Sequence, residues 1–185
     1  MNTQMPDANQ IQDNAKLDPE VAAAVKDDAG RAIHELKDAL HEGCEVVVSI
    51  ENYTTQCLAI LKQSQSQNNG HFKEAPEPFI LGTSIGLCSS EGGTGVGNKN
   101  YVLYGFAGME LLIYWHSARI GEKTYWIDFN DYEKYKNKDD KEILNIGKDN
   151  QSKGADSKEH GSFVITSTFG EECIKVSVLT KAQVG

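Results

Sequence analysis

The pattern of apolar and polar positions changes character near residue 43. Between Pro19 and Gly43, apolar residues recur at spacings of three and four, which is the period of a helix with one apolar stripe. Asp18 is a favoured N-cap, Pro19 is tolerated at the first helical position, and Gly43 is a natural C-cap. The sequence therefore predicts an amphipathic helix over 19–42. Its apolar stripe consists of Val21, Val25, Ala29, Ile33, Leu36 and Leu40.

Beyond Gly43 the apolar period shortens to about two, and β-branched runs alternate with polar or Gly-rich segments. Strands are predicted at 44–52, 54–62, 79–87, 101–106, 109–117, 124–129, 162–169 and 172–180. Loops are predicted at 63–78, 89–100 and 149–161, with hairpins around Ala107-Gly108 and Gly170. The charged segment 130–146 predicts a short helix with a loop. These elements indicate a mainly β fold: a β-sandwich flanked by the N-terminal amphipathic helix and a second short helix.

Composition and charge narrow the picture further. The chain has 185 residues, of which 39% are apolar, and this suffices for one domain with a core. Residues 1–17 are polar and predict a flexible tail, and 18–185 predict a single domain. The net charge of −9 argues against nucleic acid and anionic lipid, which attract basic proteins, but not against a zwitterionic surface. No segment before residue 18 has the apolar stretch of a secretory signal, so we expect a protein released without an evident signal peptide.

The residue types that most often carry catalysis or bind metals lie apart in this sequence. The four cysteines, Cys44, Cys57, Cys88 and Cys173, form no CxxC pair and stand in or beside apolar stretches. They predict small core side chains, with disulfides left open. The five histidines show no metal-ligand spacing, and EGGTGVGNKN lacks the GK[ST] of a phosphate-binding loop. We therefore expect neither an enzyme nor a metal or cofactor.

The order of the elements and several short segments carry a resemblance to a known family. A helix containing EVAAAV and LKDAL precedes the strand VVVSIEN, and TGVG precedes a strand pair. The segments LLIYW and YWIDF flank a loop, two tyrosines follow, and CIKVSVLTKA closes the chain. Over residues 19–182 this arrangement resembles the actinoporins, the pore-forming cytolysins of sea anemones and their relatives, whose sandwich is also that of fungal fruit-body lectins.

The resemblance implies a function. It implies a soluble protein that binds phosphocholine headgroups of a target-cell membrane, chiefly sphingomyelin, through its sandwich. The N-terminal helix, with the apolar stripe named above, then leaves the sandwich and lines a homo-oligomeric pore. The implied headgroup-binding residues are Tyr114, Trp115, Ser117, Tyr125, Tyr132, Tyr135, Ser64 and Val96. Aromatic rings attract quaternary ammonium groups. We expect Tyr132 and Tyr135 to be exposed, and Tyr104 and Trp126 to lie in the core.

Departures from the family leave alternatives open. The loop SARIGEKT is shorter and more polar than the family's aromatic loop, no proline follows Ser117, and Lys136 replaces a tyrosine. One alternative is a lectin-like module of the same fold that binds a surface glycan and forms no pore. In that case the helix would stay packed on the sandwich. The apolar stripe fits this alternative equally well, because permanent packing needs the same stripe. A toxin with a protein receptor is a third interpretation.

Overall fold

The computed structural model describes residues 18–39, 45–65, 70–92, 97–118, 122–152, 154–170 and 173–184. The predicted tail 1–17, and the candidates Leu40, Cys44 and Val96, lie outside these residues. The helices are α1 (Pro19–Ala39), α2 (Asp140–Asn150) and α3 (Lys181–Val184). The strands are β1 (Val46–Asn52), β2 (Leu58–Gln63), β3 (His71–Glu74), β4 (Phe79–Ile80), β5 (Ser84–Glu91), β6 (Asn98–Phe106), β7 (Met109–Ser117), β8 (Lys123–Asp131), β9 (Ala155–His160), β10 (Phe163–Gly170) and β11 (Cys173–Thr180).

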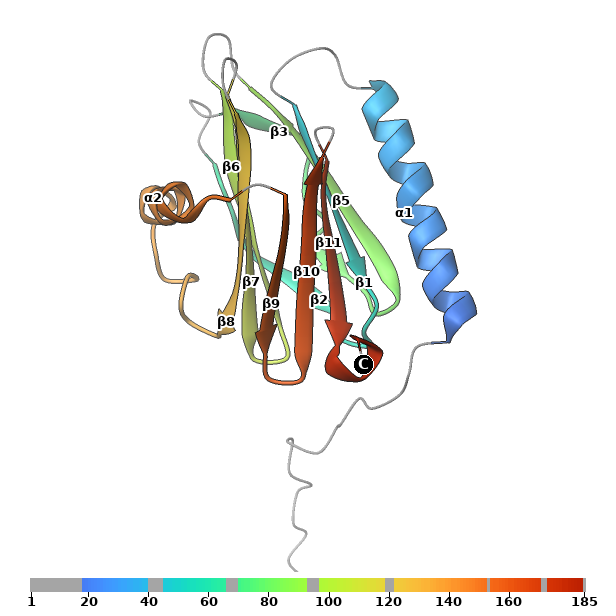
Figure 1. The fold of residues 1–185 in the computed structure, drawn as a ribbon. Coiled ribbons are helices and arrows are strands. Elements are labelled where there is room, and N and C mark those ends of the chain that lie inside the picture. Colours follow the sequence, from blue (N-terminus) through green and yellow to red (C-terminus); the bar gives the residue numbers. More distant parts are fainter. Residues whose placement is uncertain are drawn as a thin grey trace, which may run out of the picture.

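The strands form two sheets that pack face to face (Figure 1). The six-stranded sheet has the order β3-β5-β1-β11-β10-β9, and the five-stranded sheet has the order β4-β2-β6-β7-β8. Helix α1 lies on the outer face of the six-stranded sheet, against β1 and β5, and α2 lies on the outer face of the five-stranded sheet (Figure 1). The mainly β sandwich with an N-terminal helix and a short second helix is therefore confirmed.

The first and last long strands of the sandwich are neighbours. β1 pairs with β11 in parallel, so that Ser49 lies opposite Lys175 and Glu51 opposite Ser177. The other strand pairs among the described residues are antiparallel, including the hairpins β6–β7 and β10–β11 that the sequence predicted. The parallel pair joins residues 126 positions apart, as Glu51 and Ser177 are, so the six-stranded sheet is complete only when β1 and β11 have both formed.

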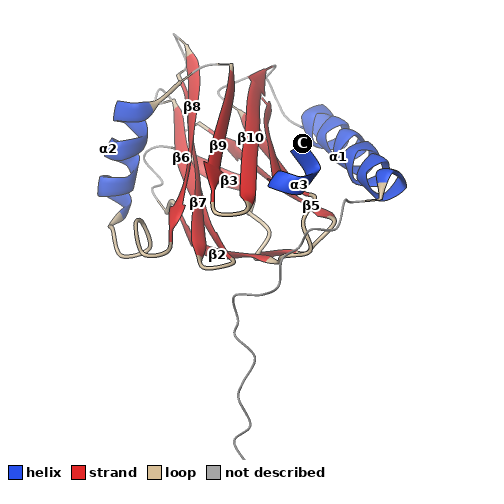
Figure 2. Ribbon diagram, turned by 60° about the horizontal axis from the view of Figure 1, so that its bottom comes forward, coloured by secondary structure: helices blue, strands red, loops and turns tan. Residues whose placement is uncertain are grey.

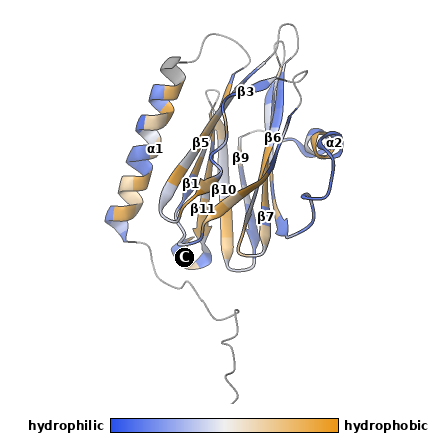
Figure 3. Ribbon diagram, turned by 180° about the vertical axis from the view of Figure 1, so that it is seen from behind, coloured by the Kyte–Doolittle hydropathy of each residue, from blue (hydrophilic) through white to orange (hydrophobic). Residues whose placement is uncertain are grey.

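The main hydrophobic core fills the space between the two sheets. Its members alternate along β1, β7 and β11 with residues that face outward, as the pleat requires. Figure 3 shows the apolar colour concentrated along the strands, while α1 carries both polar and apolar residues. The core includes Val48, Ile50, Tyr104, Ile113, Trp115, Tyr125, Ile127, Ile165, Ile174, Val176 and Val178. None of the α1 side chains that the structure describes belongs to it.

The structure corrects several sequence-based expectations. The predicted strand 79–87 is two strands, because Thr83 adopts a positive φ of 54° in a turn between β4 and β5. The predicted loop 149–161 contains β9, an edge strand that pairs with β10. The second helix begins only at Asp140, where Asp139 and Glu142 form a capping box. Of the cysteines, Cys88 and Cys173 are buried as expected, but Cys57 is exposed.

One end of the sandwich, drawn at the bottom of Figure 1 and turned toward the viewer in Figure 2, gathers many turns. We call it the lower end and define it by residues 53–57, 79–83, 107–108, 132–134, 161–162 and 181–184. Hydrogen bonds tie these segments together: Thr83 N donates to Thr54 O (3.0 Å), and Tyr132 N donates to Gly108 O (3.1 Å). The N-terminus of α1 lies toward the same end (Figure 1).

Two helical glycines give opposite predictions for the same substitution. A Cβ at Gly147 of α2 would lie 2.4 Å from the buried ring of Tyr114, whereas a Cβ at Gly30 of α1 would meet nothing within 4 Å. Gly147→Ala should lower the free energy of unfolding by about 1–3 kcal/mol through overpacking. Gly30→Ala should raise it by up to about 1 kcal/mol, because alanine favours the helix. Urea unfolding followed by circular dichroism measures both. Equal effects at the two sites would contradict the packing of α2 on Tyr114.

Candidate functional site

Most of the predicted headgroup-binding residues lie inside the protein. Trp115 and Tyr125 are fully buried between the two sheets, and Tyr114 is fully buried between the five-stranded sheet and α2. Ser117 and Ser64 are buried as well. The reason is that both faces of β7 and β8 are covered, so neighbouring residues that point in opposite directions are all removed from water. These side chains are therefore not accessible to a lipid headgroup in this conformation.

A buried polar network holds the indole of Trp115 in place. Its Nε1 donates to Ser90 Oγ (2.9 Å), and Asn98 Nδ2 donates to the same oxygen (2.9 Å). Asn100 Nδ2 donates to Asn98 Oδ1 (2.6 Å), and Ser64 Oγ donates to Asn100 Oδ1 (2.6 Å). The network brings Ser64 and Trp115 into the same part of the core. Because its members satisfy one another, we assign it a structural role.

The two tyrosines after β8 have different environments. Tyr132 is exposed, but Tyr135 is 1% exposed, so the expectation that Tyr135 faces solvent was wrong. The Tyr135 hydroxyl donates to Asp128 and its ring meets Trp126 edge-on, with centroids 6.4 Å apart. Burial, followed by the Asp128 contact, raises the pKa of Tyr135. Both tyrosines precede α2 rather than lie on it. Tyr104 and Trp126 are in the core, as expected.

A buried carboxylate positions the segment that carries Tyr132. Glu110 on β7 is fully buried and accepts three backbone N–H bonds, from Glu133 (3.1 Å), Tyr135 (2.7 Å) and Lys136 (3.2 Å). The Nζ of Lys136 then lies 4.0 Å from the centroid of the Tyr132 ring. A cation thus already occupies the ring face at which a quaternary ammonium group would bind. The sequence signal for Glu110 was a single carboxylate within the apolar run MELLIYW, which we had not singled out.

Helix α1 is attached to the sandwich by a narrow stripe. Val25, Ala29 and Ile33 are buried and Leu36 is half-buried, but Val21 is exposed, so its predicted packing in the soluble form was wrong. Ile33 and Leu36 form a small cluster with Val47, Leu87 and Cys173 on the outer face of the six-stranded sheet. This cluster is separate from the main core. The helix therefore contributes a local attachment rather than part of the sandwich interior.

The sheet surface beside and beneath α1 contains buried polar side chains. Ser49 of β1 is fully buried, and its hydroxyl has no hydrogen-bond partner among the described residues. Glu51, two residues further along β1, is buried and accepts hydrogen bonds from Tyr53 OH (2.8 Å) and Ser177 Oγ (3.2 Å) at the same oxygen, Oε2. A buried hydroxyl without a partner costs about 1–3 kcal/mol, which weakens the attachment of α1.

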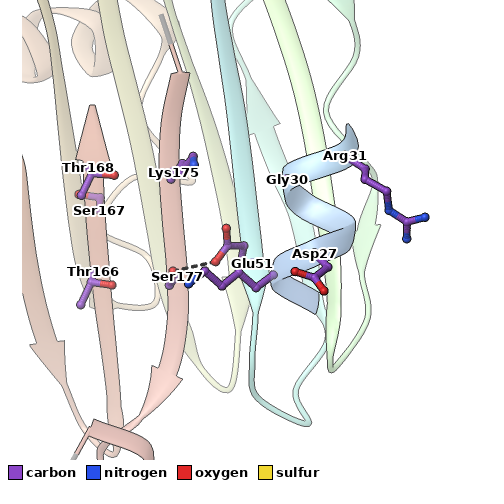
Figure 4. A pocket seen from close by; sticks show the side chains of 10 residues that line it. Asp27, Gly30, Arg31, Glu51, Thr166, Ser167, Thr168, Lys175 and Ser177 are labelled. Atoms are coloured by element: carbon purple, nitrogen blue, oxygen red, sulfur yellow. Dashed lines mark hydrogen bonds between the residues drawn. The ribbon is translucent and has the colours of Figure 1, made fainter. Parts of the chain in front are cut away.

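Open grooves run along both flanks of α1. On one flank, a groove of about 760 Å³ lies between α1 and the strands β1, β10 and β11 (Figure 4). Figure 4 shows Asp27 of α1, Glu51 of β1 and Ser177 of β11 close together in this groove. On the other flank, a groove of about 320 Å³ is lined by Glu35, Leu36, Glu74 and Leu87, among others. Water therefore reaches both sides of the stripe that holds the helix.

The part of the chain that the structure describes contains no group of three or more His, Cys, Asp or Glu residues placed to hold a metal ion. Within the same residues, no helix is both long enough and apolar enough to cross a membrane.

Comparisons with known proteins identify the fold. No protein-family model and no curated protein matches this chain. Among solved structures, the crystal structure of the lipid binding protein Nakanori matches with a TM-score of 0.70. The match has 18% sequence identity and covers 94% of this chain and 91% of that one. At this identity the likeness shows that the two chains share a fold. The pore-forming part of the actinoporin resemblance stays a prediction.

Two serines on neighbouring strands test the polar surface beneath α1. Ser49→Ala removes a buried hydroxyl without a partner and should raise the free energy of unfolding by about 1 kcal/mol. Ser177→Ala removes a donor to Glu51 and should lower it by about 1 kcal/mol. Urea unfolding of both variants measures the difference. A loss of stability in Ser49→Ala as large as that in Ser177→Ala would show that the Ser49 hydroxyl has a partner.

The role of Glu110 gives a second prediction. Glu110→Gln replaces one acceptor oxygen with an NH₂ donor that faces backbone N–H groups, so we expect a loss of about 2–3 kcal/mol. Glu133→Gln is the matched control, because that side chain is exposed and pairs with Lys136 only at the surface. The control should change stability by less than about 1 kcal/mol. Similar losses in the two variants would rule out Glu110 as the support of this segment.

Proposed function

We propose that the protein binds membrane lipids through its sandwich and forms pores with helix α1. The observation that carries the proposal is the attachment of α1 by a narrow stripe on a polar sheet surface, outside the main core. The shared fold with a protein described as lipid-binding supports the lipid part. We propose a soluble form that then acts at a target-cell membrane.

The sandwich is built so that it can survive the departure of α1. Its main core lies between the sheets and uses none of the described side chains of α1. Departure would expose Val47 and part of Leu87, while Ser49 and Glu51 would regain water. Each large apolar side chain that the helix withdraws, such as Ile33, loses about 1.5–3 kcal/mol of burial. The hydrocarbon part of a membrane can bury the same side chains, and this burial offsets the free energy lost when they leave the sandwich.

The dimensions and charges of α1 suit a pore lining. Its 21 residues, at a rise of about 1.5 Å each, span about 32 Å, close to the hydrocarbon core of about 30 Å. One face carries Lys26, Asp27 and Arg31, so a single copy cannot lie entirely in lipid. Several copies can place these charges around water and their apolar stripes toward lipid. The proposed pore is therefore a homo-oligomer.

Headgroup recognition is the less direct part of the proposal. Among the predicted aromatic residues, Tyr132 has an exposed ring, and Lys136 covers one face of it. A phosphocholine group that binds this ring must displace the Lys136 ammonium, which can then contact the phosphate. The net charge of −9 favours zwitterionic over anionic lipid. Sphingomyelin and phosphatidylcholine both meet this requirement.

Two substitutions at Gly30 test the pore. Gly30→Pro removes a helical hydrogen bond and clashes with the preceding turn, at a cost of about 3 kcal/mol, so α1 cannot cross a bilayer as one straight helix. We expect dye release from vesicles to fall by about tenfold or more, while vesicle binding is retained. Gly30→Ala is the matched control and should release dye as the unmodified protein does. Release and co-sedimentation are measured with and without sphingomyelin in phosphatidylcholine vesicles.

Each result decides between the interpretations. Equal release by both Gly30 variants would exclude α1 as the pore lining. Binding without release by the unmodified protein would leave a lipid-binding protein that forms no pore. Binding to a glycan array with no vesicle binding would favour the lectin-like alternative.

A further inference from the structure

The large apolar side chains that remain exposed are concentrated at the lower end. Among the described residues, those with the largest exposed fractions are Phe79 and Leu81, each 63% exposed. The remaining ones are Val184 (56%), Tyr132 (42%) and Val21 (38%). They come from β4, the β4–β5 turn, α3, the segment after β8, and the first turn of α1. The segment after β8, α3 and the first turn of α1 lie at or toward the lower end (Figures 1 and 2). β4 lies there as well, because it pairs with Leu58 and Ala59, which directly follow residues 53–57.

Phe79 and Leu81 are held outward rather than left loose. They are two residues apart with the buried Ile80 between them, so both side chains point away from the core. The buried Asn52 side chain donates to Leu81 O (2.9 Å) and to Gln56 O (2.7 Å). Ser84 Oγ also donates to Leu81 O (2.7 Å). The buried Asn52 amide thus fixes a turn whose apolar side chains, Phe79 and Leu81, face water, which is unfavourable in the free protein. Apolar side chains held exposed in this way indicate a surface that binds an apolar partner.

The charged residues of the lower end, Glu133, Lys134 and Lys181, each pair with a nearby residue of opposite charge. Lys136 pairs with Glu133 (2.8 Å), Lys134 with Asp128 (2.8 Å) and Lys181 with Glu159 (3.3 Å). His160 Nε2 lies 2.7 Å from Asp131 Oδ1. Removing a charged group from water costs less free energy when the group keeps a partner of opposite charge. The lower end thus combines apolar side chains with locally balanced charge, although the whole chain carries −9.

These features favour a lipid surface over a protein partner. The apolar side chains come from separate segments around one end, and neither of the two grooves along α1 includes them. A flat, electrically neutral surface can contact all of them at once. Aromatic and aliphatic side chains flanked by lysines are also the composition of interfacial membrane contacts.

We propose that the lower end is the face that lies on a zwitterionic bilayer, with Phe79 and Leu81 inserted below the headgroups. The proposal rests on the proposed lipid binding and adds the orientation of the sandwich on the membrane. Tyr132 and Val184 lie at the rim of the contact. The first turn of α1, with Val21, enters the headgroup layer beside them.

Fluorescence quenching tests the orientation with the full chain. Leu81→Trp places an indole in the proposed contact, and Thr168→Trp places one at an exposed position of β10 toward the other end. The two native tryptophans are buried, and the unmodified protein gives their signal for subtraction. On phosphatidylcholine–sphingomyelin vesicles with brominated acyl chains, we expect quenching at position 81 to exceed that at position 168 by about twofold or more. Co-sedimentation of the same samples reports binding separately.

The outcomes separate the orientation from lipid binding itself. Co-sedimentation with quenching at position 168 but not at position 81 overturns the proposed orientation and keeps lipid binding. No co-sedimentation with any vesicle overturns lipid binding, and the orientation with it.

A charge-insertion variant tests the same face without a probe. The double variant Phe79→Glu with Leu81→Glu should lower vesicle affinity by about tenfold or more. Its thermal unfolding should not change, because both side chains are exposed. Thr168→Glu is the matched control and should bind as the unmodified protein does. Unchanged vesicle affinity in the double variant overturns the proposal. The proposal is also overturned if the unmodified protein forms a dimer and the double variant loses this dimer but still binds vesicles.

Discussion

The parallel pairing of β1 with β11 determines what lies beneath α1 and what gathers at the lower end. It places Ser49 beside Lys175 and Glu51 beside Ser177, so the outer face of the sheet presents polar groups next to α1. Both strands also finish at the lower end, where Gln183 Nε2 donates to Tyr53 O (2.8 Å). A single strand pair therefore sets both the polar surface beside α1 and the position of α3.

The burial of the aromatic residues follows from the covering of both sheet faces. The run MELLIYW lacks the alternation of a strand with one wet face, and such continuous apolar runs indicate burial on both sides. The burial of Tyr114 and Trp115 was therefore predictable from the sequence. Which element covers Tyr114 was not, because Ile143 and Leu144 of α2 reach it from a helix that the sequence placed several residues too early.

Local chemistry explains which other elements could be predicted. The start of α1 and the hairpins β6–β7 and β10–β11 have strong local signals, namely an N-cap, a glycine turn and β-branched runs. Strand β9, with the sequence ADSKEH, has no apolar alternation and exists because it pairs with the edge of β10. Tyr135 is likewise buried by distant groups, Glu110 and Trp126, that leave no mark in its own neighbourhood.

The orientation of α1 constrains how the lower end and a pore can act together. The helix begins at the lower end, and its last residues lie about 30 Å away at the other end. If the lower end rests on the membrane, a helix that crosses the bilayer must advance by about its own length. The six residues 40–45 that link α1 to β1 reach at most about 20 Å when extended. Contact through the lower end therefore implies that the N-terminal part of α1 enters first, led by Val21. At this stage Ile33 and Leu36 still contact Val47 and Leu87, and these contacts break only when the whole helix leaves the sandwich to line the pore.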